Sequence, residues 1–255
     1  MRTVFLLALL SAGCVAELEG IEDESDEIGT SSRIALNGLT APSTDLSLNV
    51  DPSLIRAVAK GSLATAGTRV PALFTTAKGR EQFAYLYGCA ERPGKTLTIS
   101  ANGTSYVYEG AMGLAREWLT DLLPSTKYKL VSACMLARTN YFGIHVSISM
   151  RNKQIATPST ERDGYTVVEG AFWGDVFTPG APMRACASPT KLSGVAISTL
   201  PQRECAVSVD GAITKCGFGY AGDCSNACVT DLTKKLGYSD CEGYVDAIAV
   251  FVAKP

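Results

Sequence analysis

The chain has 255 residues, of which 46% are apolar, so it can bury a substantial core. Its formal net charge of −2 and its scattered Lys and Arg residues exclude the basic footprint of a nucleic-acid-binding protein. Beyond residue 13, no apolar stretch reaches the about 20 residues that a membrane-spanning helix needs.

The first 13 residues have the organisation of a signal peptide. Arg2 supplies a positive charge, and the apolar run from Val4 to Leu10 is too short to span a bilayer. The small residues Ser11-Ala-Gly then lead into Cys14, and together they resemble the lipobox of bacterial lipoproteins.

This resemblance gives Cys14 a specific role. In that family the cysteine sulfur receives a diacylglycerol and the chain is cut before it, which implies a mature protein that begins at Cys14 and is held by lipid. Each buried CH₂ contributes about 0.8 kcal/mol, so two or three acyl chains anchor a protein stably. In Gram-negative lipoproteins, Asp directly after the lipid-bearing cysteine is associated with retention at the inner membrane. This chain has Val15 there, which implies the outer membrane, on its periplasmic or surface face. The alternative is an ordinary secretory signal cleaved near Ala16.

An acidic segment follows Cys14. Seven acids precede the next base, Arg33, whereas from Arg33 onward 22 Lys and Arg residues outnumber 18 Asp and Glu residues. The acids are Glu17, Glu19, Glu22, Asp23, Glu24, Asp26 and Glu27. Because such a segment cannot build a core, we expect residues 14–50 to be a mostly disordered tether and linker. A binding peptide is the other interpretation of the acidic run.

Two helices are predicted next. Asp51 is a favourable N-cap residue, Pro52 suits the first helical position, and Gly61 ends the first helix. The second helix is predicted over residues 78–90 from helical spacing of apolar residues. The spaced residues are Leu54, Ile55 and Val58 in the first helix, and Phe83, Leu86, Tyr87 and Ala90 in the second.

A β-hairpin and two more helices follow. Apolar and polar residues alternate on both sides of Asn102-Gly103, a dipeptide typical of a type I′ turn, so residues 96–109 are predicted to form a hairpin. Helices are predicted over 113–123 and 126–139, with Pro124 between them.

The rest of the chain favours strands. Strict alternation over residues 144–151 predicts a strand with one buried face. Residues 152–165 are polar and could mark a boundary, and apolar segments such as 171–177 lie beyond them. The nearly continuous apolar run over 244–252 predicts a final strand that is buried on both faces.

These elements predict an α+β fold. We expect residues 51–255 to form one globular unit with two lobes. A helix-and-hairpin N-terminal lobe covers about residues 51–151, and a disulfide-rich, β-rich C-terminal lobe covers about residues 164–255.

The cysteines support an exported protein. With Cys14 assigned to lipid, eight cysteines remain, and an even number in an oxidising compartment indicates disulfides. They are Cys89, Cys134, Cys186, Cys205, Cys216, Cys224, Cys228 and Cys241. A zinc site at Cys224-x3-Cys228 is a less favoured alternative, because no histidine lies nearby and exported thiols oxidise.

Cys89 and Cys134 are the best expected pair, since both lie on predicted apolar helices. They enclose 44 residues, and closing such a loop stabilises the fold by about 4 kcal/mol in the chain-entropy model. The other six cysteines allow 15 pairings by counting alone. Cys224 and Cys228 are only four positions apart, so we expect each to pair elsewhere.

Several segments together resemble a group of uncharacterised secreted lipoproteins typical of myxobacteria. The segments are Leu36-Asn-Gly-Leu39, Tyr87-Gly-Cys-Ala90, Val131 to Tyr141, Glu169 to Phe177, and Cys216-Gly-Phe through Cys224 to Cys228. They span most of residues 33–241. The resemblance implies one folding unit over 33–255 with two lobes, and it also implies that Cys89 and Cys134 belong together. It implies no activity.

The chain offers little catalytic chemistry. Its single histidine, His145, lies on the polar side of a predicted strand, and no nucleophile elbow, phosphate loop or dinucleotide fingerprint is present. Glu169 and Asp175 flank the aromatic pair Phe172-Trp173, and glycosidases use two carboxylates beside an aromatic platform. In an extended strand the two residues share a face but lie about 20 Å apart, at about 3.3 Å per residue, so catalysis by this pair requires a sharp bend. The alternative is a buried aromatic core strand, which requires no bend.

The leading hypothesis is therefore a lipid-anchored envelope lipoprotein that presents a non-enzymatic surface for binding or structure. Its expected partners are the membrane, through lipid on Cys14, and an envelope protein or glycan. No cofactor or metal is expected. The alternative is an envelope glycan hydrolase that uses the carboxylates of Glu169 and Asp175. A cleft lined by these residues and Trp173 favours the hydrolase, and burial of Trp173 in the core favours the binding protein.

Overall fold

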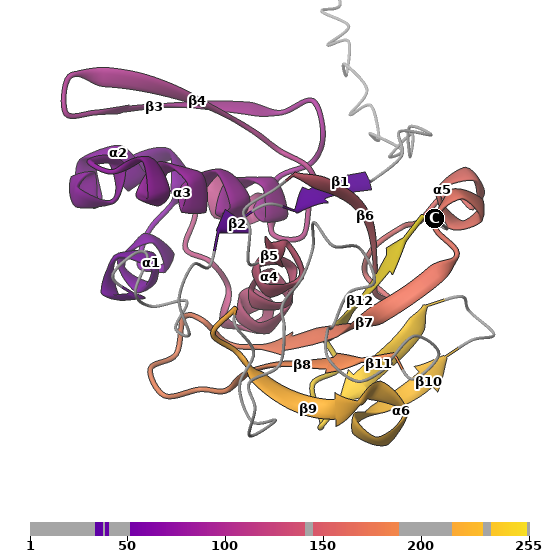
Figure 1. Cartoon of the computed structure of the whole chain (residues 1–255). Coiled ribbons are helices and arrows are strands. Elements are labelled where there is room, and N and C mark those ends of the chain that lie inside the picture. Colours follow the sequence, from indigo (N-terminus) through magenta and orange to yellow (C-terminus); the bar gives the residue numbers. More distant parts are fainter. Residues whose placement is uncertain are drawn as a thin grey trace, which may run out of the picture. The chain divides into compact units, whose positions relative to one another are not determined.

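The computed structural model describes residues 34–37, 39–40, 52–140, 145–188, 216–231 and 236–253. The predicted signal peptide with Cys14, the acidic run, Asp51 and Cys205 lie outside the described residues. The described residues belong to one compact unit, which is drawn in Figure 1. Its fold is α+β, as predicted. The C-terminal part carries one disulfide between a strand and a helix and another between two strands.

Short helices form the N-terminal part of this unit. α1 (Pro52–Ala59), α2 (Ala66–Arg69) and α3 (Ala77–Ala90) alternate with the 3-10 helices η2 (Leu63–Thr65) and η3 (Pro71–Phe74). α1 and α3 confirm the first two predicted helices. Thr76 caps α3, because its Oγ1 accepts a hydrogen bond of 3.0 Å from the Gly79 N–H. The four apolar residues expected on one face of α3 are all buried: Phe83, Leu86, Tyr87 and Ala90.

The predicted hairpin is confirmed as β3 (Thr96–Ala101) and β4 (Thr104–Glu109). Asn102 and Gly103 have φ values of 53° and 76°, as a type I′ turn requires. The inner face of the hairpin packs on α3, where the Tyr108 and Phe83 rings meet edge to face with centroids 4.7 Å apart.

The helix predicted over 113–123 is wrong, because only the 3-10 helix η4 (Arg116–Leu119) forms there. Gly113 adopts a left-handed φ of 69°, which ends any helical run. The N–H groups of residues 111–115 donate instead to the carbonyl oxygens of residues 88–91, over 2.7–3.1 Å. The carbonyl groups at the end of α3 have no hydrogen-bond donors within the helix, so residues 111–115 supply the missing donors.

α4 (Ser125–Ala137) confirms the next predicted helix, and α5 (Ser159–Gly164) lies within the polar stretch. β5 (Thr139–Asn140) follows α4 and pairs in parallel with β2 (Leu39–Thr40).

A central sheet organises the described part of the chain. Its order is β1-β6-β12-β7-β8-β9, with β9 parallel to β8 and every other neighbouring pair antiparallel. The strands are β1 (Ile34–Asn37), β6 (Val146–Arg151), β12 (Ile248–Val252), β7 (Val167–Gly174), β8 (Met183–Ala187) and β9 (Gly219–Asp223). All five residues of β12 are buried, as predicted for the last strand. The strand begins at Ile248 and not at residue 244, and Val245 is exposed.

Both faces of this sheet are covered (Figure 1). α4 lies on one face, where Phe172 and Val250 join the larger core. The other face is covered by α6 (Cys224–Ala227) and by the ribbon of β10 (Cys228–Asp231) and β11 (Gly237–Cys241). Trp173 and Phe251 point to this second, smaller core.

The structure of the central sheet differs from two expectations. Residues 144–151 were expected to bury one face only, yet Ile148 to Arg151 are all buried in β6. β6 has neighbouring strands on both edges, Ile148 and Met150 join the larger core, and Arg151 packs on the Phe251 ring. Residues 34–37 belong to the predicted linker but form β1, which satisfies the free backbone edge of β6. The two expected lobes thus share one sheet, since β6 pairs directly with β12.

Candidate functional site

Glu169 is the extra residue of a β-bulge in β7. Val250 and Phe251 of β12 are consecutive, but they pair with Gly170 and Val168, so Glu169 is skipped. Its side chain is buried, with 3% of the residue exposed, and its carbonyl oxygen accepts the Ser188 N–H at 2.9 Å. The bulge interrupts the alternation of side chains between the two faces of β7.

Asp175 lies just beyond the end of β7 and holds the turn that follows. Its Oδ1 accepts the N–H groups of Phe177 at 2.9 Å and Thr178 at 3.1 Å, and its Oδ2 accepts the Thr178 hydroxyl at 2.6 Å. The residue is only 9% exposed. These three hydrogen bonds give the carboxylate a structural role in the turn.

Trp173, which lies between Glu169 and Asp175 in the sequence, is fully buried. It packs in the smaller core with Ala171, Cys186 and Tyr238. A side chain with 0% exposure offers no platform to a sugar. Trp173 thus belongs to the core.

β7 does not bring Glu169 and Asp175 together. Residues 170–174 between them form a paired strand, and at about 3.3 Å per residue the two positions lie roughly 20 Å apart. Glycosidase carboxylates lie about 5–10 Å apart. The two residues therefore lie well beyond the separation of a glycosidase pair.

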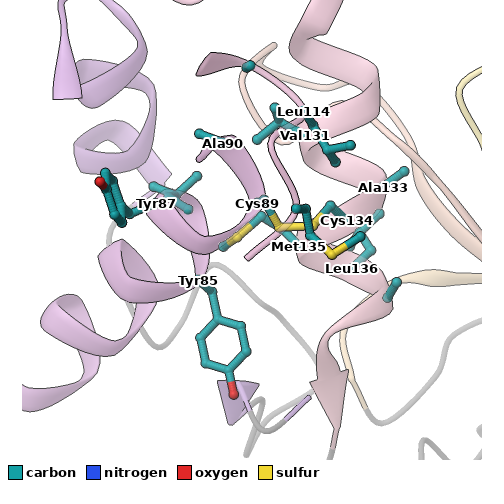
Figure 2. Close-up of a cluster of buried hydrophobic side chains, with 14 of the residues drawn as sticks. Tyr85, Tyr87, Cys89, Ala90, Leu114, Val131, Ala133, Cys134, Met135 and Leu136 are labelled. Atoms are coloured by element: carbon teal, nitrogen blue, oxygen red, sulfur yellow. A yellow bond between two sulfur atoms is a disulfide. The ribbon is translucent and has the colours of Figure 1, made fainter. Parts of the chain in front are cut away.

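Cys89 and Cys134 are joined by a disulfide, the pair favoured by the sequence. Figure 2 shows the bridge between α3 and α4, surrounded by apolar side chains that include Val131 and Met135. Both cysteines are fully buried. The bridge ties the hairpin-bearing helix α3 to α4, which covers the sheet.

A buried cation lies close to this bridge. The Arg138 guanidinium is 4.5 Å from the centroid of the Tyr85 ring, and its Nη1 lies 3.9 Å from the Cys89 sulfur. Burial lowers the pKa of Arg138 to about 10, so it still carries its charge at neutral pH. Gly88 makes room for it, because a Cβ there would lie 2.7 Å from Nη1.

Four cysteines form what we call the four-sulfur cluster: Cys186, Cys224, Cys228 and Cys241. One disulfide joins Cys186 of β8 to Cys224 of α6, and the other joins Cys228 to Cys241 across the ribbon. The Cys186 and Cys228 sulfurs belong to different bridges but lie only 3.6 Å apart. Cys216 is also disulfide-bonded.

The pairing bears on the zinc alternative. Cys224 and Cys228 each pair elsewhere, as expected from their short separation. The sulfurs of Cys186, Cys224 and Cys228 lie within 4.8 Å of one another. Zinc binds thiolates, and sulfurs held in disulfides are not thiolates, so the oxidised cluster is not a zinc ligand set.

Arg151 carries a second buried charge, on the same face of the sheet as Trp173. Its guanidinium carbon lies 3.6 Å from the centroid of the Phe251 ring, and its Nε donates to the Ser149 Oγ at 3.2 Å. A further hydrogen bond reaches the Tyr165 carbonyl. Burial lowers the pKa of Arg151 to about 10, and the nearby Glu161 opposes that shift.

His145 lies exposed directly before β6. Burial raises the pKa of Glu81, and the charge of His145 opposes the shift. In the described part of the chain, no serine or cysteine nucleophile is hydrogen-bonded to His145.

Sequence reasoning missed the features that depend on pairing. Nothing local marks Glu169 as a bulge residue, because the bulge exists only relative to β12. One feature of the sequence could have indicated that Arg151 is buried, namely its place at the end of an alternating strand that also contains Ser149. Apart from the density of cysteines, no feature of the sequence indicates the contact between the two disulfides.

Comparison with known proteins finds no matching family model, no matching curated protein and no matching solved structure. Among the described residues, no helix combines the length and apolar character that crossing a bilayer requires.

Proposed function

We propose that this protein is a lipid-anchored lipoprotein of the cell envelope whose folded unit serves as a binding or structural surface rather than an enzyme. The observation that carries the proposal is the burial of Trp173, together with the structural use of the Asp175 carboxylate. The segment with the most catalytic promise in the sequence is thus part of the core. The disulfides among the described residues support a unit built for an oxidising exterior.

The anchor of the proposed protein is lipid on Cys14, and its location is the outer membrane. The supporting observations are the positive charge of Arg2, the short apolar run and the small residues before Cys14. The acidic run between Cys14 and Arg33 would then hold the folded unit away from the lipid surface.

The anchor is tested by expressing the full chain in a bacterium with labelled palmitate. We expect label on the wild-type protein and its recovery with the membranes. The Cys14→Ser variant should carry no label and should be recovered in the soluble fraction. A wild-type mature chain that begins after Ala16 and carries no lipid would contradict the anchor.

The binding role is tested by cross-linking whole cells that carry the wild-type protein, followed by purification and mass spectrometry. We expect a defined envelope protein that is absent when Cys14→Ser removes the anchor. If the purified protein instead hydrolyses peptidoglycan or another glycan, and Glu169→Gln abolishes that activity while the fold persists, the proposal is wrong.

A further inference from the structure

The four-sulfur cluster places two disulfides in contact. Cys228 of one bridge and Cys186 of the other have their sulfurs 3.6 Å apart, about the van der Waals separation of two sulfur atoms. Cys186, Cys224 and Cys241 are fully buried, whereas Cys228 is only half-buried. The contact between the bridges is thus made by Cys186 and Cys228, whose disulfide partners are Cys224 and Cys241.

We propose that the four-sulfur cluster is a thiol–disulfide exchange site that reacts with a dithiol. Disulfides exchange when a thiolate attacks a disulfide sulfur and displaces the second sulfur as a thiolate. The proposal concerns the chemistry of the folded unit and does not depend on the proposed lipid anchor.

The reaction begins at the more accessible bridge. A dithiol attacks Cys228, the Cys228–Cys241 bond breaks, and Cys241 leaves as a thiolate. The second thiol of the reductant then releases Cys228 and closes the reductant into its own disulfide. Two electrons and two protons pass from the dithiol to the protein in this stage.

The second stage is internal. The Cys228 thiolate attacks Cys186 at 3.6 Å, a Cys186–Cys228 bond forms, and the Cys186–Cys224 bond breaks. Cys224 leaves as a thiolate and takes up a proton. No net oxidation or reduction occurs in this stage, because one disulfide replaces another.

The same product follows from the other direction. If the dithiol first reduces Cys186–Cys224, the Cys186 thiolate attacks Cys228 and displaces Cys241. Both routes lead to a Cys186–Cys228 bridge with thiols at Cys224 and Cys241. The product keeps β8 joined to the start of β10, and it releases the covalent hold of α6 on β8 and of β11 on β10.

The test uses the purified full chain under native conditions with one equivalent of dithiothreitol. Free thiols are labelled with N-ethylmaleimide. The remaining disulfides are then reduced and labelled with iodoacetamide, and mass spectrometry assigns the label at each cysteine. In chains that carry two maleimides within the four-sulfur cluster, we expect those labels on Cys224 and Cys241. Cys89 and Cys134, in their buried bridge, should carry the second label only and serve as an internal control.

Two single variants test the internal step without any reductant. Cys241→Ser leaves a thiol at Cys228, and exchange should move the maleimide label to Cys224. Cys224→Ser leaves a thiol at Cys186, and exchange should move the label to Cys241. The matched control Cys134→Ser leaves a thiol at Cys89, where the label should remain.

The proposal is overturned if the partly reduced wild type carries its labels on Cys228 with Cys241, or on Cys186 with Cys224. It is also overturned if a folded Cys241→Ser protein is labelled at Cys228 alone. Should either variant fail to fold, the label positions in the wild type still decide the question.

Discussion

The Asp175 carboxylate and the Thr178 hydroxyl form a 2.6 Å hydrogen bond at the end of β7. The same carboxylate accepts two backbone N–H groups, and the turn it holds leads to Phe177, whose ring packs against Trp118 with centroids 5.8 Å apart. A residue that the sequence offered as a catalytic acid is thus a structural anchor between β7 and the helical core.

Replacing this carboxylate should destabilise the protein. Asp175→Ala leaves two backbone N–H groups without their acceptor at a nearly buried position, and we expect a loss of about 2–4 kcal/mol in the free energy of unfolding. Asp175→Asn keeps an acceptor oxygen and should lose less. Urea unfolding measures both, with Asp163→Ala at an exposed position of α5 as the control. Equal stability of Asp175→Ala and wild type would refute the structural role.

How far the sequence predicted this fold depends on the range of each interaction. α3 and the β3–β4 hairpin follow from local signals, namely the apolar spacing around Phe83 and the Asn102-Gly103 turn, and both predictions are confirmed. The helix expected after Gly113 failed because residues 111–115 bind the end of α3 instead. That competition comes from a distant segment, and periodicity within a window does not report it.

The candidate site shows the same limit. The identity and order of Glu169, Trp173 and Asp175 are visible in the sequence, but their directions depend on how β7 pairs. The bulge at Glu169 arises from its register against β12, about 80 positions later in the chain. The pairing of Cys89 with Cys134 could be inferred because both lie on strongly apolar helices, whereas the remaining connectivity depended on how the ribbon folds over β8.

The disulfides should stabilise the protein more when they close longer loops, with a logarithmic dependence on loop length. Cys89 and Cys134 are 45 positions apart, and the double change to Ala should cost about 4 kcal/mol by the chain-entropy model. Cys228 and Cys241 are 13 positions apart, and their replacement by Ala should cost about 3 kcal/mol. Thermal and urea unfolding of both double variants test this order. A larger loss for the ribbon bridge would contradict the loop-length argument.

The two buried tryptophans should differ in their response to Phe. Both are fully buried, but the Trp118 Nε1–H donates to the Gly61 carbonyl at 3.0 Å, whereas the Trp173 Nε1 has no hydrogen-bond partner among the described residues. Trp118→Phe therefore loses packing volume and a hydrogen bond, and Trp173→Phe loses volume alone. We expect Trp118→Phe to be less stable than Trp173→Phe by about 1 kcal/mol. Urea midpoints measure the difference, and the reverse order would show that repacking around Trp173 dominates.

Glu91 should make the protein less stable as pH rises from the acid range. The residue is 4% exposed at the end of α3, and burial raises its pKa, although Arg92 and Arg116 oppose the shift. A carboxyl whose pKa is higher in the folded state binds its proton more tightly there, so folding is favoured below the unfolded pKa. That contribution is lost as pH rises from the ordinary value of 4.5 through the higher folded value.

Glu91→Gln removes this titration, and the free energy of unfolding of the variant should fall less than that of wild type as pH rises through this window. Glu81 and Asp246 have pKa values raised by burial in the same direction, so part of the slope should remain. Urea unfolding at a series of pH values measures the slopes. Glu109→Gln removes a carboxylate from an exposed position of β4 and corrects for the change in net charge. If Glu91→Gln keeps the wild-type slope, burial of Glu91 does not contribute to the pH dependence.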